Sequence, residues 1–193
     1  MNLELLERSM QKLKNGDIEA FDDIYTITSG TVFILAYSIL KNKARAEDVV
    51  QETYIRVFKK IVKYKFNTNA AAWISSIARH LSFDELDKSK RNVSLEVFEG
   101  NIVNADFDLA ESVHLKMVFE TLDADEREIV ILFAIDSLKH REIAEVVNKP
   151  VGTVQWIYNK AIKKLREKMR KEAGIADFKE AAGSGNGGLK WKI

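Results

Sequence analysis

Base-reading chemistry is suggested by three neighbouring side chains, those of Thr153, Gln155 and Trp156, near the start of a predicted helix. The amide of a glutamine can pair with the edge of adenine. Side chains at this end of a recognition helix are the ones that meet the major groove. The cations that could follow the phosphates lie farther along the same helix: Lys160, Lys163 and Lys164.

The residues before this segment have the spacing of a helix-turn-helix. Ala144 is the small residue needed where two helices approach, and Asn148, four residues later, tolerates the positive φ that the turn requires. Val154 follows after six more residues and can pack back on the first helix. Pro150 suits the first turn of the second helix, because its missing N–H would be unpaired there. The alternative is an ordinary helical hairpin with a charged face.

The charge of the chain is unevenly distributed, although its net value is only +1. Residues 55–69 carry five basic side chains and no acidic one, and residues 154–171 carry seven basic side chains and one acidic one. Between them, residues 94–128 carry ten acidic side chains and two basic ones. Two basic segments joined by an acidic one suit a protein that touches DNA at two places. Ordinary solvated helix faces would give the same charges.

Apolar residues recur at helical spacing along most of the chain, and no alternation typical of a strand persists. The expected helices are 3–14, a second one capped by Asp17, a core helix at 31–40, an amphipathic helix at 46–63 and another at 70–87, with a polar loop at 65–69 and a second helical unit at 111–172. We therefore predict an all-α fold made of two small helical domains, the second a helix-turn-helix domain.

The predicted boundaries follow from these patterns. Residues 1–91 form the first domain, 92–110 a flexible acidic linker, 111–180 the second domain and 181–193 a flexible tail. The linker lacks the apolar periodicity that could bury it, so the two domains are expected to move independently. The glycine-rich composition of the tail is typical of a flexible segment.

Several classes of function lack support in the sequence. There is no cysteine, and the three histidines are scattered without carboxylates at ligand spacing, so no metal site is expected. Phosphate-cradling glycine loops and nucleophile motifs are missing, which argues against an enzyme and predicts no cofactor. No apolar run approaches the length that spans a bilayer, and the N-terminus lacks a signal-peptide pattern. We therefore expect a soluble cytoplasmic protein without membrane insertion.

Several motifs, in this order along the chain, resemble one protein family, the extracytoplasmic-function (ECF) sigma factors of bacterial RNA polymerase. Ala46–Glu52 looks like the family's polymerase-binding region, and Trp73–Arg79 with Asp84–Leu86 looks like its promoter-melting region. Leu122–Glu128, Glu142–Glu145, Gly152–Val154 and Lys163–Arg166 look like pieces of its second DNA-binding region. The resemblance implies a protein that binds core RNA polymerase and recognises the −10 and −35 elements of promoter DNA. It also implies an anti-sigma partner, and we expect a monomer when the protein is free.

The resemblance assigns roles to residues in the first domain. The polymerase-binding residues would be Asp48, Gln51, Glu52, Tyr54, Ile55 and Phe58. A loop that captures a flipped base of the −10 element would contain Lys63, Tyr64, Phe66 and Asn67. Trp73, Ser76, Arg79 and His80 would flank this base, and Lys88, Lys90 and Arg91 would contact phosphates. Trp73 is read first as a core side chain and only second as a functional one, because large apolar rings on inward faces usually pack.

In the second domain the resemblance assigns Thr153, Gln155 and Trp156 to the −35 element. Two departures from the family pattern stand out: His80 replaces a common Asn, and Gln155-Trp156-Ile157 replaces a common Lys-Ser-Arg. Ile157 is therefore either a core residue or a DNA-facing one. The rival interpretation is a helix-turn-helix transcription regulator whose N-terminal helical domain binds a ligand or a partner.

Overall fold

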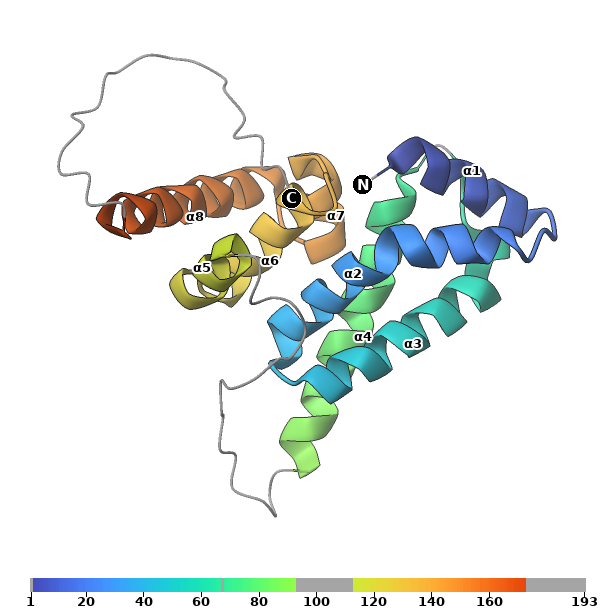
Figure 1. Cartoon of the computed structure of the whole chain (residues 1–193), viewed down its shortest axis with the longest axis horizontal. Helices are drawn as coiled ribbons and strands as arrows, with labels where there is room; N and C mark the ends of the chain where they lie inside the picture. Colours follow the sequence, from blue (N-terminus) through green and yellow to red (C-terminus); the bar gives the residue numbers. More distant parts are fainter. Residues whose placement is uncertain (1, 67, 93–112, 173–193) are drawn as a thin grey trace.

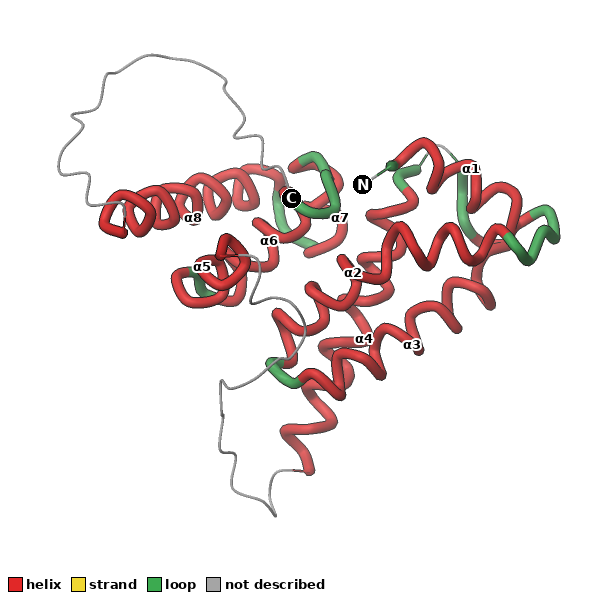
Figure 2. The backbone as a smooth tube through the Cα atoms, viewed as in Figure 1, coloured by secondary structure: helices red, strands yellow, loops and turns green. Residues whose placement is uncertain are grey.

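The computed structural model describes residues 2–66, 68–92 and 113–172, and every regular element in this part of the chain is a helix (Figures 1 and 2). The helices are α1 (Leu3–Lys14), α2 (Ala20–Leu40), α3 (Lys43–Lys60), the short 3₁₀ helix η1 (Ile61–Lys63), α4 (Ala70–Asn92), α5 (Val113–Thr121), α6 (Ala124–Ala134), α7 (His140–Val147) and α8 (Val151–Glu172). The all-α prediction is confirmed. Nearly all of the predicted linker and the whole predicted tail lie outside the described residues.

Helix α2 differs from the prediction. A helix capped by Asp17 and a separate core helix at 31–40 were expected, but one helix runs from Ala20 to Leu40 and passes through Gly30. Asp17 is not the cap, because the helix begins after Glu19 without a side-chain hydrogen bond. It ends at Lys41, whose φ of 55° is left-handed. Gly30 therefore lowers the helix propensity of this segment but does not interrupt the helix.

The length and composition of α2 would also allow it to cross a membrane, contrary to the expectation from the sequence. In the structure α2 is instead the central helix of the molecule. It packs against α1, α3 and α4 of the first domain and against α6 of the second domain. Its apolar character is explained by these neighbours, since a helix covered on several faces is hydrophobic nearly all round.

The helix-turn-helix forms as its spacing predicts. Asn148 ends α7 in the left-handed region with a φ of 53°. Ala144 and Val154 are buried where α7 and α8 meet. Pro150 lies one position before α8 rather than in its first turn, and its carbonyl accepts the Val154 N–H at 3.1 Å. Ile157 is only 6% exposed, so it belongs to the core.

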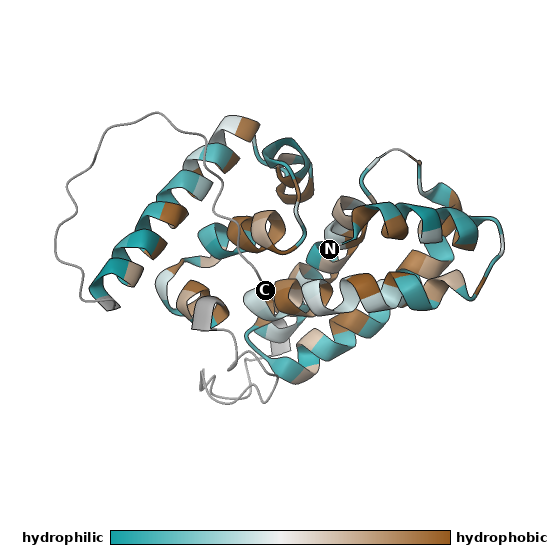
Figure 3. Cartoon of the chain, turned by 45° about the horizontal axis from the view of Figure 1, so that its top comes forward, coloured by the Kyte–Doolittle hydropathy of each residue, from teal (hydrophilic) through white to brown (hydrophobic). Residues whose placement is uncertain are grey.

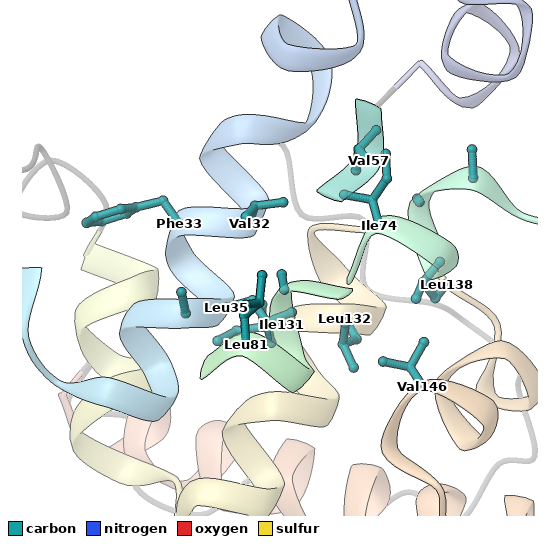
Figure 4. Close-up of a cluster of buried hydrophobic side chains, with 14 of the residues drawn as sticks. Val32, Phe33, Leu35, Val57, Ile74, Leu81, Ile131, Leu132, Leu138 and Val146 are labelled. Carbon is teal, nitrogen blue, oxygen red and sulfur yellow. The ribbon is translucent and has the colours of Figure 1, made fainter. Parts of the chain in front are cut away.

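The two domains share one apolar core, which the sequence did not predict. In Figure 4, Leu35 of α2 and Leu81 of α4 gather with Ile131 of α6. Leu132 and Leu138 belong to the same cluster and are almost fully buried. Full burial of each such side chain contributes about 1.5–3 kcal/mol relative to exposure. The described parts of the two domains therefore pack together, whereas independently moving domains were expected.

Candidate nucleic-acid and partner interfaces

The first turns of α8 present the predicted base-reading residues to solvent. Thr153 and Gln155 are exposed, and the Trp156 side chain is 63% exposed, which is unusual for so large an apolar ring. Val154 and Ile157 turn the opposite way into the core and hold the helix in place. Figure 3 shows how hydrophilic most of α8 is beyond its buried stripe. Among the described residues this end of α8 is thus largely exposed to solvent, with the Lys160 ammonium 5.4 Å from the ring centroid of Trp156.

Two of the three predicted phosphate-binding lysines of α8 are engaged inside the domain. The Nζ of Lys164 lies 2.6 Å from Oε2 of Glu126, and the Nζ of Lys160 lies 3.0 Å from Oε1 of the same carboxylate. Asp123 adds a second carboxylate, whose Oδ2 lies 3.8 Å from the Nζ of Lys160 and 3.7 Å from the Nζ of Lys164. Lys163 is exposed on the same helix. Lys163 is therefore the best placed of the three for a phosphate.

Glu126 is the centre of this cluster and is itself 1% exposed. Burial alone would raise the pKa of Glu126, but the hydrogen bonds from Lys164, Lys160 and the Asp123 backbone outweigh it and lower the pKa to about 2. Asp123 and Glu126 also form a capping box at the start of α6. The sequence carried this signal, because an acidic N-cap followed three residues later by Glu is its signature.

The exposed face of α3 contains most of the predicted polymerase-binding residues. Asp48 and Gln51 are exposed, and the apolar side chains of Ile55 and Phe58 are 46% and 47% exposed. Glu52 is half-buried and pairs with Arg56 at 2.9 Å, one helical turn away. Acidic and amide groups beside half-exposed apolar ones give the composition of a docking surface.

Tyr54 differs from these residues because it points into the core. It is 4% exposed, and its hydroxyl lies 2.7 Å from the Thr28 hydroxyl. Burial raises the pKa of Tyr54 well above its ordinary value. Its ring contacts that of Tyr25, whose centroid is 4.8 Å away and whose side chain is 46% exposed. Tyr54 therefore supports the surface from beneath, and Tyr25 is the exposed aromatic that sequence reasoning missed.

The predicted −10 loop is tied to α1. Tyr64 is 1% exposed, and its hydroxyl donates to both carboxylate oxygens of Glu7 at 2.8 Å. Glu7 also accepts the Ala70 N–H at 2.7 Å, where α4 begins. Lys14 donates to the Tyr64 carbonyl at 2.6 Å and lies 4.8 Å from the ring centroid of Phe66.

Within this loop the structure brings only part of the predicted set to the surface. Lys63 is exposed and Phe66 is half-buried, while Asn67 lies outside the described residues. Tyr64 is buried and supports the loop. Glu7 and Lys14 were missed by sequence reasoning. They precede Tyr64 by 57 and 50 positions, and the sequence has no signal for contacts between residues so far apart.

The predicted DNA-binding residues of α4 have mixed surroundings. Trp73 is half-buried against Tyr64, with the ring centroids 5.2 Å apart. Part of its side chain therefore packs in the domain, and part is exposed to solvent. The Ser76 hydroxyl donates to the Trp73 carbonyl at 2.7 Å, and His80 is exposed 3.5 Å from Asp84. Lys88 and Lys90 are exposed, and the side chain of Arg91 lies outside the described residues.

Arg79 is the residue of this set that touches the other domain. Its Nε donates to Oε1 of Glu128 on α6 at 2.6 Å, and its guanidinium lies 4.6 Å from the ring centroid of Phe83. One turn earlier on α4, Ser75 donates to Oδ2 of Asp136 at 2.7 Å. These contacts cross between the domains at the helix that is predicted to bind the −10 element.

Comparison with known families agrees with the two-part architecture. The family description "Sigma-70 region 2" matches residues 7–92, and "Sigma-70, region 4" matches residues 114–165. These ranges coincide with the α1–α4 bundle and with the unit that contains the helix-turn-helix. The chain belongs to the sigma-70 family of transcription initiation factors.

Individual relatives narrow the class further. The ECF RNA polymerase sigma factor SigW of Bacillus subtilis is 27% identical over 184 residues, which cover 86% of this chain and 97% of SigW. The structure resembles that of RpoE from Bartonella quintana, solved with the anti-sigma factor NepR, with a TM-score of 0.62, 20% identity and coverage of 79% and 98%. CnrH, solved with the cytosolic domain of CnrY, gives a TM-score of 0.62, 19% identity and coverage of 87% and 99%. Within the sigma-70 family, this chain is a member of the ECF group.

Proposed function

We propose that this chain binds core RNA polymerase through the exposed face of α3 and directs initiation at specific promoters. In this proposal the loop before α4, with α4 itself, recognises the −10 element, and the start of α8 recognises the −35 element. The observation that carries it is the coexistence of three exposed surfaces of suitable chemistry in the order of the family. They are the α3 face with Ile55 and Phe58, the loop anchored on α1, and the solvent-exposed Trp156.

The polymerase-binding part predicts a selective loss of affinity. Replacing Gln51 and Glu52 together by Ala should weaken binding to core polymerase several-fold while the melting temperature stays nearly unchanged, because both side chains lie outside the fully buried core. Competition against a second sigma factor measures the affinity. The matched control is Glu4→Ala with Gln11→Ala on α1, which removes the same two side-chain types and a comparable Glu–Arg pair. Equal affinities of the two double variants would refute the assignment.

The proposed function as a whole is tested by run-off transcription with core polymerase on genomic fragments. A sigma factor gives defined start sites only when it is added to core enzyme. The rival, a regulator of the helix-turn-helix class, would bind duplex DNA alone and as a dimer. Specific duplex binding by the isolated chain, with no start sites, would favour that rival.

The finer parts of the proposal concern regulation and place in the cell. We infer an anti-sigma partner because two structures of the same fold were solved with such regulators or with part of one. A non-enzymatic, cytoplasmic role follows from the proposed partners, which are polymerase and promoter DNA. A mass measurement of the free protein tests whether it is monomeric.

A further inference from the structure

The indole ring of Trp156 lies on the solvent side of α8, although it is the largest side chain of that helix. Its 63% exposure contrasts with Val154 and Ile157, which are buried in the core. Long side chains on a helix lean toward its N-terminus, which for Trp156 is the turn that carries Gly152. A β-carbon at Gly152 would meet no atom within 4 Å, so this turn is open. The packing of the domain therefore does not explain why an indole stands at this position.

Lys160 contacts this ring from the next turn of α8. Its Nζ lies 5.4 Å from the ring centroid, within the range of a cation–π interaction. The same Nζ lies 3.0 Å from Oε1 of Glu126, whose side chain is 1% exposed, and 3.8 Å from Oδ2 of Asp123. The buried carboxylate thus holds the ammonium, and the ammonium holds the ring. Because the ring is held before a ligand arrives, less conformational freedom is lost on binding.

The chemistry of the major groove limits what an indole can recognise there. Bases in a duplex are stacked, so only their edges are accessible, and the apolar group on these edges is the C5-methyl group of thymine. The indole N–H could instead donate a single hydrogen bond. Adenine, guanine and thymine all present acceptors in this groove, so one donor alone distinguishes them poorly. An apolar contact with a thymine methyl group is the selective interaction that this side chain can make.

We propose that Trp156 contacts the methyl group of a thymine in the −35 element, and that Lys160 positions the ring rather than binding a phosphate. This inference rests on the function proposed above, and it names the group on the DNA that the start of α8 recognises. Lys163, which is exposed, remains the lysine of this helix that is best placed for a phosphate. Lys160 therefore contributes to sequence preference and not to the salt dependence of binding.

The methyl contact is tested by removing one methyl group from the DNA. Once run-off transcription has mapped a promoter, each thymine of its −35 element is replaced in turn by deoxyuridine, which lacks only that group. Holoenzyme binding should weaken at one position by about fourfold, the factor that corresponds to burying one methyl group. Trp156→Ala holoenzyme should bind the thymine and deoxyuridine forms equally. Trp156→Phe keeps an apolar ring without the N–H, so it should retain the preference for thymine.

The role of Lys160 is tested by the thymine preference together with the salt slope. Lys160→Gln removes the ammonium, so it should reduce the preference for thymine while the salt slope stays unchanged, because no phosphate contact is lost. Glu126 keeps its contact with Lys164, 2.6 Å away, so this variant should stay folded, which thermal melting checks. Lys160→Arg keeps a cation that can stack on the ring and pair with Glu126, so it should restore the preference. Lys163→Gln, the same change at an exposed lysine, is the matched control: it should lower the salt slope by about one unit and keep the preference.

The outcomes separate this inference from the proposed function. No loss at any thymine, or an equal loss in the native chain and in Trp156→Ala, would overturn the methyl contact. Loss of the preference in Trp156→Phe would assign the contact to the indole N–H and would overturn it too. An unchanged preference in Lys160→Gln, or a salt slope lowered by about one unit, would overturn the positioning role. A chain that forms no promoter-specific holoenzyme would overturn the proposed function itself.

Discussion

Lysines on an exposed-looking helix face need not be available for DNA. Lys160 and Lys164 have the composition and spacing of phosphate ligands, yet both lie against the buried carboxylate of Glu126. Sequence periodicity places a lysine on a face of a helix, but it does not show which acid from another helix meets it. The same limit applies to Tyr54 and Tyr64, whose positions were predicted to bind partners and whose side chains are buried.

Substituting Glu126 by Gln should destabilise the second domain by about 1–2 kcal/mol, because the charge-assisted hydrogen bond from Lys164 becomes a neutral one and the ion pair with Lys160 is lost. Urea unfolding followed by circular dichroism measures this loss. Glu167→Gln, an identical change at an exposed position of α8, is the control and should have no effect. The pKa of Glu126 is lowered from 4.5 to about 2, so its stabilising effect is present above pH 4.5 and is lost as the pH falls through about 2. Equal stability of the two variants would contradict this role.

Base reading and phosphate binding should be separable on α8. Gln155→Ala should cost roughly 1–3 kcal/mol at the preferred −35 sequence and much less at a scrambled one, because an amide contacts base edges. Lys163→Ala should weaken all promoters alike and lower the salt slope of binding by about one unit. Holoenzyme binding across a salt titration, with matched and scrambled −35 elements, gives both quantities. If Gln155→Ala weakened both elements equally, the base-reading assignment would be wrong.

At the scale of helices, local patterns predicted most of the fold. Periodicity located α1, α3 and α4 to within a few residues, and the αL residue Asn148 was correctly placed between α7 and α8. The prediction failed in two cases: where a residue disfavours a helix without breaking it, and where a contact joins residues far apart in the sequence. Gly30 did not end α2, because a glycine lowers helix propensity without removing a hydrogen bond. The role of α1 as the anchor of the loop after η1 was invisible, since it depends on Glu7 meeting Tyr64 across 57 residues.

This anchor predicts a defect in promoter opening. Glu7→Gln replaces a carboxylate that accepts from both Tyr64 and Ala70 by an amide with a single acceptor oxygen. The loop should loosen, so holoenzyme should unstack the −10 base several-fold less well while its affinity for core polymerase is unchanged. Fluorescence of 2-aminopurine placed in the −10 element reports the unstacking. Glu4→Gln, exposed on the same helix, is the control, and a defect of equal size in both would argue against a positioning role for Glu7.

At the scale of the whole molecule, the class of protein was predictable and the packing of the two domains on each other was not. The motifs lie within single domains, so they predicted both regions that the family comparison finds. The packing of the second domain on the first, α6 on α2 and α7 on α4, includes pairs such as Ser75 with Asp136, 61 residues apart, which have no signature in one sequence. An aperiodic acidic segment between two helical units predicts freedom of movement even when the units pack together.

Closure should depend on pH. Burial raises the pKa of Asp136 from 3.8 to about 6 where the two domains pack together, the closed form, against the hydrogen bond from Ser75. The Tyr54 hydroxyl is a nearby titratable group on α3. The closed form therefore holds a proton that the open form releases. Its stability relative to the open form is greatest below about pH 4 and falls as the pH rises through about 6.

Energy transfer between dyes on Lys12→Cys of α1 and Glu167→Cys of α8, one exposed position in each domain of a chain without cysteine, measures this dependence between pH 5 and 8. Asp136→Asn keeps an acceptor for Ser75 without a charge, so it should remain closed over this range and show a smaller pH dependence. Some dependence should remain, since burial also raises the pKa of Glu128 in the same interface. An unchanged pH response in Asp136→Asn would show that another group controls closure.

The bond between Arg79 and Glu128 also affects how substitutions at Arg79 should be read. If one guanidinium serves both the closed form and the promoter complex, removing it weakens two competing states at once. The observed change in transcription is then the difference between the two losses, and it underestimates the contribution of Arg79 to either. Only a comparison made in a Glu128→Gln background, where the competing bond is already weakened, would approach its full contribution to DNA binding.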